Sequence, residues 1–370
     1  MGADVIKVER PDGGDSARAY DGALNGTSAY FAWLNRGKRS VVLDLKRSED
    51  HDVCAQLLAR ADVFVHNLAP GAVERLGFGY EALAVRNSRL VWCGISGYGP
   101  DGPLRDKKAY DMLVQAESGV VSLTGSANAP AKVGISIADI ASGLYAYSSV
   151  LAALLRRGRT GKGARVDISM LECLTEWMTP ALYVWHGMGQ VPARVGVRHN
   201  MIVPYGAYAC ADGSVLFAVQ TQREWRRFCV DVLHNAALAD DVRFATNAER
   251  LKHRVELESM IEHRLRVFPR AQVNAWLAAA DIPTGDVNDV PAVMAHTQLA
   301  ARSRWTTVGA PGGSIPALLP PHNLGGAAPR MGDVPALGAH TAEVIAELAR
   351  DRTHDQARDH ARDQTQEANR

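Results

Sequence analysis

The sequence has 370 residues and a formal net charge of +1, with 22% of its residues charged and 47% hydrophobic. This composition is typical of a globular protein with a sizeable buried core, most simply divided into two domains. The balanced charge gives no field that would draw the chain to nucleic acid or to a membrane surface. No uninterrupted apolar run is long enough to span a bilayer.

The amino-terminal stretch MGADVIKVERPDGG lacks the basic and apolar leader of a secreted protein. The 5 cysteines are scattered along the chain, without a CxxC pair or a His/Cys cluster that would hold a metal. We therefore expect reduced thiols, no metal site and a cytoplasmic location.

Short apolar runs alternate with helical segments through the first half of the chain. Such alternation is typical of an α/β fold with a Rossmann-like parallel sheet, in which ligands bind at the carboxyl ends of the strands. Strands are expected at residues 4–9, 41–45, 61–68, 90–96 and 164–169, with helices at 48–59, after Pro70-Gly71 and at 171–186.

The second half of the chain predicts a smaller α/β domain inserted into the larger one. The segment 188–206 is rich in turn-forming residues and is interpreted as a crossing linker. Within 207–300, Asp212-Gly213 predicts a hairpin turn. The large domain would thus comprise residues 1–190 and 303–350, and the small domain residues 207–300. The polar tail, 351–370, is expected to be disordered.

A long apolar helix is expected to begin near Asp139. Ser136 and Asp139 lie where side-chain oxygens commonly cap a helix, while the small residues around Asp139 would leave room for a ligand. Spacing alone leaves both interpretations open, and Asp111 and Asp167 are interpreted as structural. The residues expected on the buried face of this helix are Ile140, Leu144, Tyr147, Val150, Leu151, Leu154 and Leu155.

Basic residues follow the predicted strands or lie on the next turns, where a phosphate-bearing ligand would be bound. Solvated surface charge is the alternative for each of them. Neither GxGxxG nor GxxxxGK[ST] occurs, so the sequence signals neither a dinucleotide nor a nucleoside triphosphate. These basic residues include Arg10, Arg36, Lys38, Arg39, Lys46, Arg75, Lys107 and Lys108.

Several motifs in consistent order resemble the class III CoA-transferases, the family of formyl-CoA transferase and carnitine CoA-transferase. They run from Gly2 to about Ala349 and include GADVIKVERPDGGD, NRGKRSVVLDLK, ADVFVHNLAPGAVERLGFGYEAL, ISGYGPDGP, KKAYDMLVQAESG, RRGRTGKGARVDISML and PALGAHTAEVIAELA. The resemblance implies a nucleophilic aspartate at Asp139. It also implies contacts with coenzyme A at Arg10, at Leu43 to Lys46, at Asn67 and Leu68, at Arg75 and at Lys108.

The same resemblance implies acyl-CoA and small carboxylic acids as substrates, no permanently bound cofactor and an interlocked homodimer. The run AKVGISIADIASGLYAYS is most similar to the branch that uses succinyl-CoA with itaconate, mesaconate or citramalate. A dicarboxylate has a second carboxylate that a cation would bind. Arg194, Arg198 and His199 are candidates, with a surface loop as the alternative.

Two further functions stay open. An α-methylacyl-CoA racemase has the same fold but needs two acid/base groups, and Tyr110 stands where that branch has a histidine before the residue aligned with Asp111. An inactive CoA-binding relic is the other, because the strand, helix and glutamine that open the family fold find no match in the sequence. In that case we expect exposed apolar surface at Val5, Ile6 and Val8.

Overall fold

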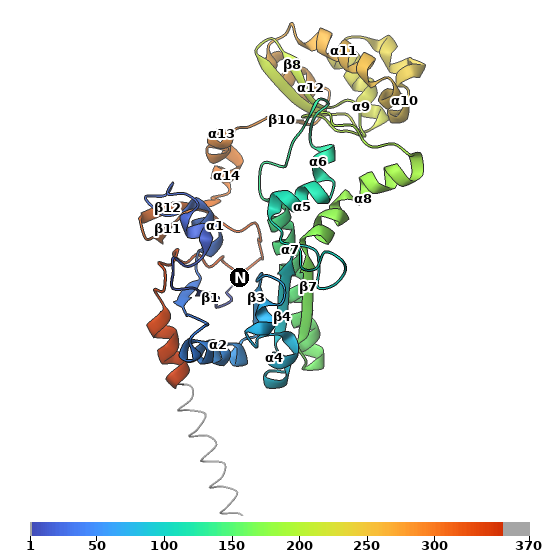
Figure 1. Ribbon diagram of the computed structural model, residues 1–370. Coiled ribbons are helices and arrows are strands. Elements are labelled where there is room, and N and C mark those ends of the chain that lie inside the picture. The colour runs from blue at the N-terminus through green and yellow to red at the C-terminus, as the bar shows by residue number, and fades with distance from the viewer. Residues whose placement is uncertain (1, 351–370) are drawn as a thin grey trace, which may run out of the picture.

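The computed structural model describes residues 2–350, so the tail 351–370 lies outside the described chain. The predicted parallel strands are present (Figure 1), but they form two sheets rather than one. β1 (Ile6–Glu9) pairs with β2 (Arg39–Val42), and β3 (Val63–His66) pairs with β4 (Val91–Ser96), which pairs with β7 (Ala164–Ser169). Within residues 2–350, β1 and β3 are therefore both edge strands.

The open edges expose apolar side chains. Val5 is 40% exposed, Val8 is 38% exposed, and Val65 of β3 is 52% exposed, while Ile6 is half-buried. The expected exposure at Val5 and Val8 is therefore present. An exposed apolar edge offers unpaired backbone groups to another strand, which is why folded proteins usually cover such edges.

Helices pack on these sheets, and the end of the described chain returns to β2. Arg39 pairs with Glu347 at 2.8 Å, Ser40 accepts a hydrogen bond from the His340 backbone N–H, and Val344 packs in the core beside Trp92. The helices are α1 (Ala29–Asn35), α2 (Ser48–Arg60), α3 (Ala72–Arg75), α4 (Tyr80–Arg86), α5 (Asp111–Glu117), α6 (Val120–Leu123), α7 (Ile137–Thr160), α8 (Met170–Met188) and residues 341–350.

The central helix α7 buries a different face from the one expected. Its buried side chains are small, among them Ala138, Ala141 and Ala146, whereas Leu144 is 52% exposed and Leu155 is 75% exposed. Small side chains let the helix approach β4, β7 and α8 closely, so they occupy the packed face. Among the described helices, α7 alone has the length and apolar composition to cross a membrane, although Asp139 interrupts its apolar run. Here it packs against the sheet and its neighbouring helices.

A separate domain with its own core lies beyond α8, at the top of Figure 1. Trp225, Phe217, Phe228 and Ile261 are at most 1% exposed within it. The predicted hairpin turn joins its first two strands. The elements are β8 (Tyr205–Cys210), β9 (Gly213–Ala218) and β10 (Thr284–Gly285) in an antiparallel sheet, with α9 (Gln222–Arg227), α10 (Asn247–Lys252), α11 (Arg254–Leu265), α12 (Arg270–Ala279) and a π-turn (Phe228–Val232).

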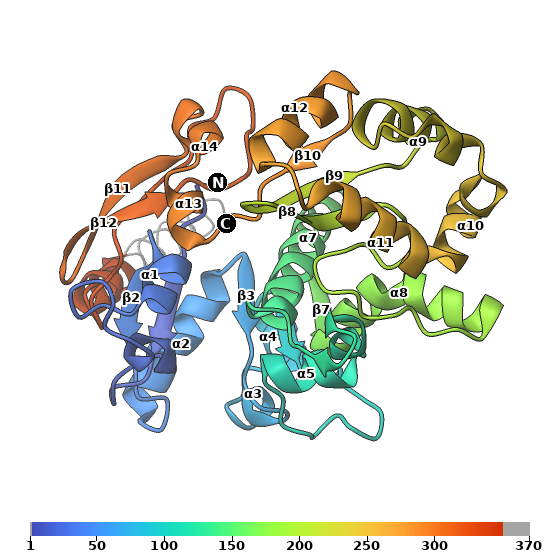
Figure 2. The ribbon, with the colours of Figure 1, turned by 90° about the horizontal axis from the view of Figure 1, so that it is seen from above.

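The chain then crosses back to the first domain. Figure 2 shows the hairpin of β11 (Trp305–Ala310) and β12 (Gly313–Leu318) lying beside α1. Phe31 of α1 and Val308 and Ile315 of the hairpin share one core cluster. The remaining elements are α13 (Val290–Met294), α14 (Thr297–Ala301), the small hairpin β5 (Gly125–Ser126) and β6 (Ala129–Pro130), and 3₁₀ turns at Ser16–Ala19, Ala236–Asp240 and Val242–Phe244.

Candidate active site

The connection between β4 and β7 places Asp139 at the ligand-binding edge of the sheet. The two strands are parallel and α7 lies between them in sequence, so α7 runs back antiparallel to both. Its first turn, which contains Asp139, therefore lies at the carboxyl ends of the strands.

The start of α7 is capped by Asp111, not by Ser136 or Asp139. Asp111 Oδ1 accepts hydrogen bonds from the backbone N–H groups of Ala138, at 2.8 Å, and Asp139, at 3.4 Å. Ser136 occupies the N-cap position but has a ψ of 69° and makes no side-chain capping bond. The capping interpretation of Ser136 and Asp139 is therefore wrong, because a carboxylate from α5 takes that role.

Asp139 as a residue is exposed, but neighbouring atoms partly enclose its carboxylate and disfavour its charge. Partial burial raises the pKa of Asp139, and the negative charge of Asp111 raises it further. The partial positive charge of the helix N-terminus acts in the opposite direction and favours the ionised carboxylate. A raised pKa makes the ionised carboxylate more basic than an ordinary aspartate, which favours attack on an electrophile.

The predicted CoA-binding cations follow elements of both parallel sheets, whereas Asp139 lies at the sheet of β3, β4 and β7. Arg10 directly follows β1, Lys46 lies in the turn after β2, and Lys108 lies between β4 and α5. All three are exposed, and so is Arg75 at the end of α3. Exposed cations of this kind can bind phosphate groups, and their contact with coenzyme A stays a prediction.

The other predicted CoA contacts differ in how accessible their side chains are to a ligand. Asn67 directly follows β3 and is exposed, and Leu68 beside it is 43% exposed. Leu43 is only 2% exposed and packs in the apolar core, so its side chain is not available. A ligand could reach Leu43 only through its backbone.

The candidate acceptor residues are bound to other parts of the chain. Arg198 forms an ion pair with Glu258, at 2.5 Å, and another with Glu262. Arg194 donates hydrogen bonds to the backbone carbonyls at positions 122, 126 and 127. His199 stacks on Tyr205 and accepts the Met201 N–H. The structure gives these three side chains packing and tethering roles, and their contact with a substrate stays a prediction.

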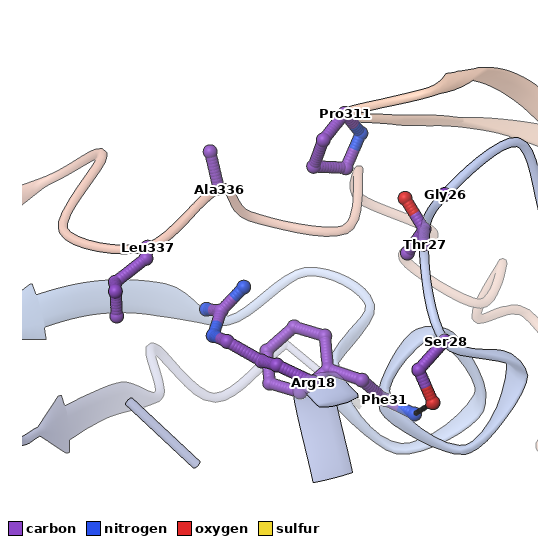
Figure 3. A pocket seen from close by; sticks show the side chains of 8 residues that line it. All are labelled: Arg18, Gly26, Thr27, Ser28, Phe31, Pro311, Ala336 and Leu337. Carbon is purple, nitrogen blue, oxygen red and sulfur yellow. Dashed lines mark hydrogen bonds between the residues drawn. The ribbon is translucent and has the colours of Figure 1, made fainter. Parts of the chain in front are cut away.

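A hollow of about 220 Å³ lies apart from Asp139, beside α1 and the turn between β11 and β12 (Figure 3). Arg18 is the charged residue in its lining, and its guanidinium pairs with Glu9 at 2.7 Å and lies over the Phe31 ring. That cation is already neutralised, so the hollow lacks a charge for an anionic ligand. The described residues contain no cluster of three or more His, Cys, Asp or Glu side chains that could hold a metal.

Sequence reasoning missed the part that Asp111 plays in this site. It follows β4 in the chain and lies 28 residues before Asp139, so only the fold brings the two together. One local pattern indicates a structural role for Asp111. Asp111 and Gln115 are polar and four positions apart at the start of a helix, a spacing at which two side chains contact each other.

The fold and the site together define a class: an α/β protein with an aspartate in the first turn of a crossover helix, at the carboxyl ends of parallel strands. The family model for CoA-transferase family III matches residues 1–341. The chain therefore belongs to CoA-transferase family III, and the resemblance drawn from its motifs is confirmed.

Similar proteins agree with this assignment. Succinate–glutarate CoA-transferase of Agrobacterium fabrum is 36% identical over 359 residues, covering 94% of this chain and 89% of the relative. Acetyl-CoA:oxalate CoA-transferase of Acetobacter aceti is 36% identical over 305 residues, covering 82% and 78%. The crystal structure of a CaiB/BaiF family protein from Brucella suis has a TM-score of 0.80 at 34% identity, covering 94% and 92%. The protein is thus a CoA-transferase by family.

Replacing Arg198 by Ala should destabilise the small domain. The change leaves Glu258, whose side chain is only 12% exposed, with Arg254 at 3.7 Å as its nearest cation. We expect the free energy of unfolding to fall by about 1–3 kcal/mol, measured by urea denaturation. Arg226→Ala is the matched control, because its pair with Asp240 is exposed and should contribute less than about 1 kcal/mol. A raised KM for the acceptor at unchanged stability would instead assign Arg198 to the substrate.

Replacing Asp139 by Asn should remove activity and raise the melting temperature near neutral pH. The folded protein raises the pKa of Asp139, so the ionised carboxylate opposes folding at any pH above its ordinary pKa. The gain in melting temperature should vanish below about pH 3, where the carboxyl is protonated in both states. Asp241→Asn is a control that should change the melting temperature in the opposite direction. Arg243 lowers the pKa of Asp241, so removing this carboxylate should lower the melting temperature near neutral pH. Equal melting temperatures of wild type and Asp139→Asn at all pH values would contradict the expectation.

Proposed function

We propose that the protein transfers coenzyme A from an acyl-CoA, namely succinyl-CoA, to a small dicarboxylic acid through covalent intermediates on Asp139. The observation that carries this proposal is the Asp139 carboxylate in the first turn of α7, which the Asp111 cap leaves without a capping role. An ionised carboxylate in this position can attack a thioester.

Four attacks complete the reaction without any added reagent. The Asp139 carboxylate attacks the thioester carbonyl of the donor and expels CoA thiolate, leaving a mixed anhydride. The thiolate attacks the aspartyl carbonyl, forms an aspartyl-CoA thioester and releases the donor acid. The acceptor carboxylate attacks this thioester, giving a second anhydride and free thiolate. The thiolate then attacks the acceptor carbonyl, giving the new acyl-CoA and restoring the Asp139 carboxylate.

The chain contributes position and charge to these steps. Arg10, Lys46 and Arg75 would bind the phosphates of coenzyme A, while Asn67 and Leu68 line the end of β3. Because the CoA thiolate leaves and returns in each half of the reaction, a tightly held CoA moiety keeps it near Asp139. Lys108 lies on the segment that leads from β4 to Asp111 and would bind the same ligand.

The choice of succinyl-CoA and a dicarboxylate is supported by the sequence around Asp139 and by the relative named succinate–glutarate CoA-transferase. The relative named for acetyl-CoA and oxalate is as similar, so oxalate is the principal competing acceptor. A second carboxylate on the acceptor would need a cation, and Arg194 is tied to the segment shortly before Asp139.

Trapping the anhydride tests the covalent role of Asp139. Incubation with succinyl-CoA followed by hydroxylamine should modify the peptide that contains Asp139, as seen by mass spectrometry. Asp139→Ala should lose both the label and transfer activity. Asp167→Ala is the control, because Asp167 pairs with Arg165 at 2.8 Å and should not carry the acyl group. Normal transfer by Asp139→Ala would refute the proposal, and an unlabelled, inactive wild type would favour the CoA-binding relic.

The same assay with other substrates identifies the branch of the family. We expect glutarate and other dicarboxylates of four or five carbons to outperform oxalate, formate and carnitine as acceptors. The reverse order would overturn the substrate assignment and leave the role of Asp139 intact.

We also propose a homodimer, in which the exposed leucine stripe of α7 and the end of α8 are covered. Leu144, Leu155, Tyr183 and Trp185 are each more than half exposed in the single chain, and large apolar side chains exposed on two packed helices suit an interface. Light scattering on a dilution series should show a dimer at every concentration, and Leu155→Glu should weaken it. Val255→Glu, at an exposed position of α11, is the control. An active wild-type monomer would exclude the dimer.

We place the enzyme in the cytoplasm. The cysteines are free and buried, and burial raises the pKa of Cys54 and Cys93 to about 11. Buried thiols of this kind suit a reducing compartment, because they neither need nor readily form disulfides.

A further inference from the structure

The amide of Gln115 lies at the contact between α5 and the segment that leads into α7. Gln115 is 0% exposed. Its Nε2 donates to Asp111 Oδ2 at 2.7 Å and to the Ile135 carbonyl at 3.3 Å, and its Oε1 accepts the Val133 N–H at 2.9 Å. The side chain therefore joins Asp111 to the chain on the amino-terminal side of Asp139.

The chemistry of these partners fixes the orientation of the amide. An ionised Asp111 carboxylate can only accept a hydrogen bond, and the Val133 backbone N–H can only donate one. A flipped amide would bring two acceptors together at Asp111 and two donors together at Val133. A buried polar group with mismatched partners costs about 1–3 kcal/mol for each unmade bond. Only one arrangement of Gln115 is therefore stable.

Through this arrangement Gln115 holds Asp139 from two sides. It orients Asp111, whose Oδ1 binds the N–H groups of Ala138 and Asp139, and it fixes the backbone at 133–135 just before the helix. An error of about 1 Å in the position of a reacting group can cost about a hundredfold in rate. Resting on the proposed role of Asp139, we infer that Gln115 is a positioning residue of the transfer reaction, acting through Asp111 on the nucleophile.

Two single substitutions and their combination test this inference. Gln115→Glu places two carboxylates against each other, and Asp111→Asn places two amide donors against each other. In the double variant, the new amide at position 111 still caps α7 through its oxygen, and its nitrogen donates to the new carboxylate at position 115. The other oxygen of that carboxylate accepts the Val133 N–H. The pair keeps a single negative charge, so the double variant restores every bond except the longer one to the Ile135 carbonyl.

We expect each single variant to lower kcat by about tenfold to a hundredfold, with KM for succinyl-CoA changed less than about threefold. The double variant should recover most of kcat. The rate of hydroxylamine trapping at Asp139 should fall in the single variants and recover in the double variant. The first attack on the donor thioester is the step that depends on the position of Asp139. Far-ultraviolet circular dichroism and melting temperature report whether each variant folds.

Normal kcat in both folded single variants would overturn the inference while leaving the trapping of Asp139 intact. Loss of kcat without recovery in a folded double variant would also overturn it. If Gln115→Glu does not fold, Asp111→Asn and the apolar Gln115→Met take its place. Each should lower kcat while changing KM for succinyl-CoA much less. Absence of any trapped acyl group in the wild type would instead refute the proposed function itself.

Discussion

The hydrogen bonds from the first N–H groups of α7 to the Asp111 carboxylate are the interaction on which the candidate site depends. A helix start leaves backbone donors that must be satisfied, and a neighbouring side chain such as Asp139 would ordinarily satisfy them. Because Asp111 reaches across from α5 to do so, Asp139 keeps both carboxylate oxygens available to a ligand. The cap also places a second negative charge close to the Asp139 carboxylate, which raises the pKa of Asp139.

The parallel strands β3, β4 and β7 explain part of the site by geometry. They belong to one sheet, so residues that directly follow them lie at the same edge although they are far apart in the sequence. Asn67, directly after β3, is an example, whereas Arg10 follows β1 of the separate two-stranded sheet. The crossover from β4 to β7 brings the start of α7 to the same edge. Asp139 and the predicted coenzyme A contact Asn67 thus lie at the same edge of one sheet.

Local signals in the sequence were sufficient for the strands, for the long helix and for the position of Asp139 at its start. They failed where a distant partner decides the outcome. The cap of α7 comes from Asp111, Leu43 packs into the core, and Arg198 pairs with Glu258 of α11. The leucine face of α7 was expected to be buried because it carries the largest apolar side chains at helical spacing. Close packing on β4 and β7 instead selects the alanine face, and the leucines stay exposed in the single chain.

The movement of carboxylate oxygen atoms tests the central claim most directly. When CoA thiolate attacks the acceptor carbonyl of the second anhydride, the bridging oxygen, which came from the acceptor acid, stays on Asp139. Turnover with an acceptor acid labelled with heavy oxygen in its carboxylates should therefore leave heavy oxygen in the peptide that contains Asp139, read by mass spectrometry. Transfer to the labelled acid with an unlabelled Asp139 peptide would contradict the account.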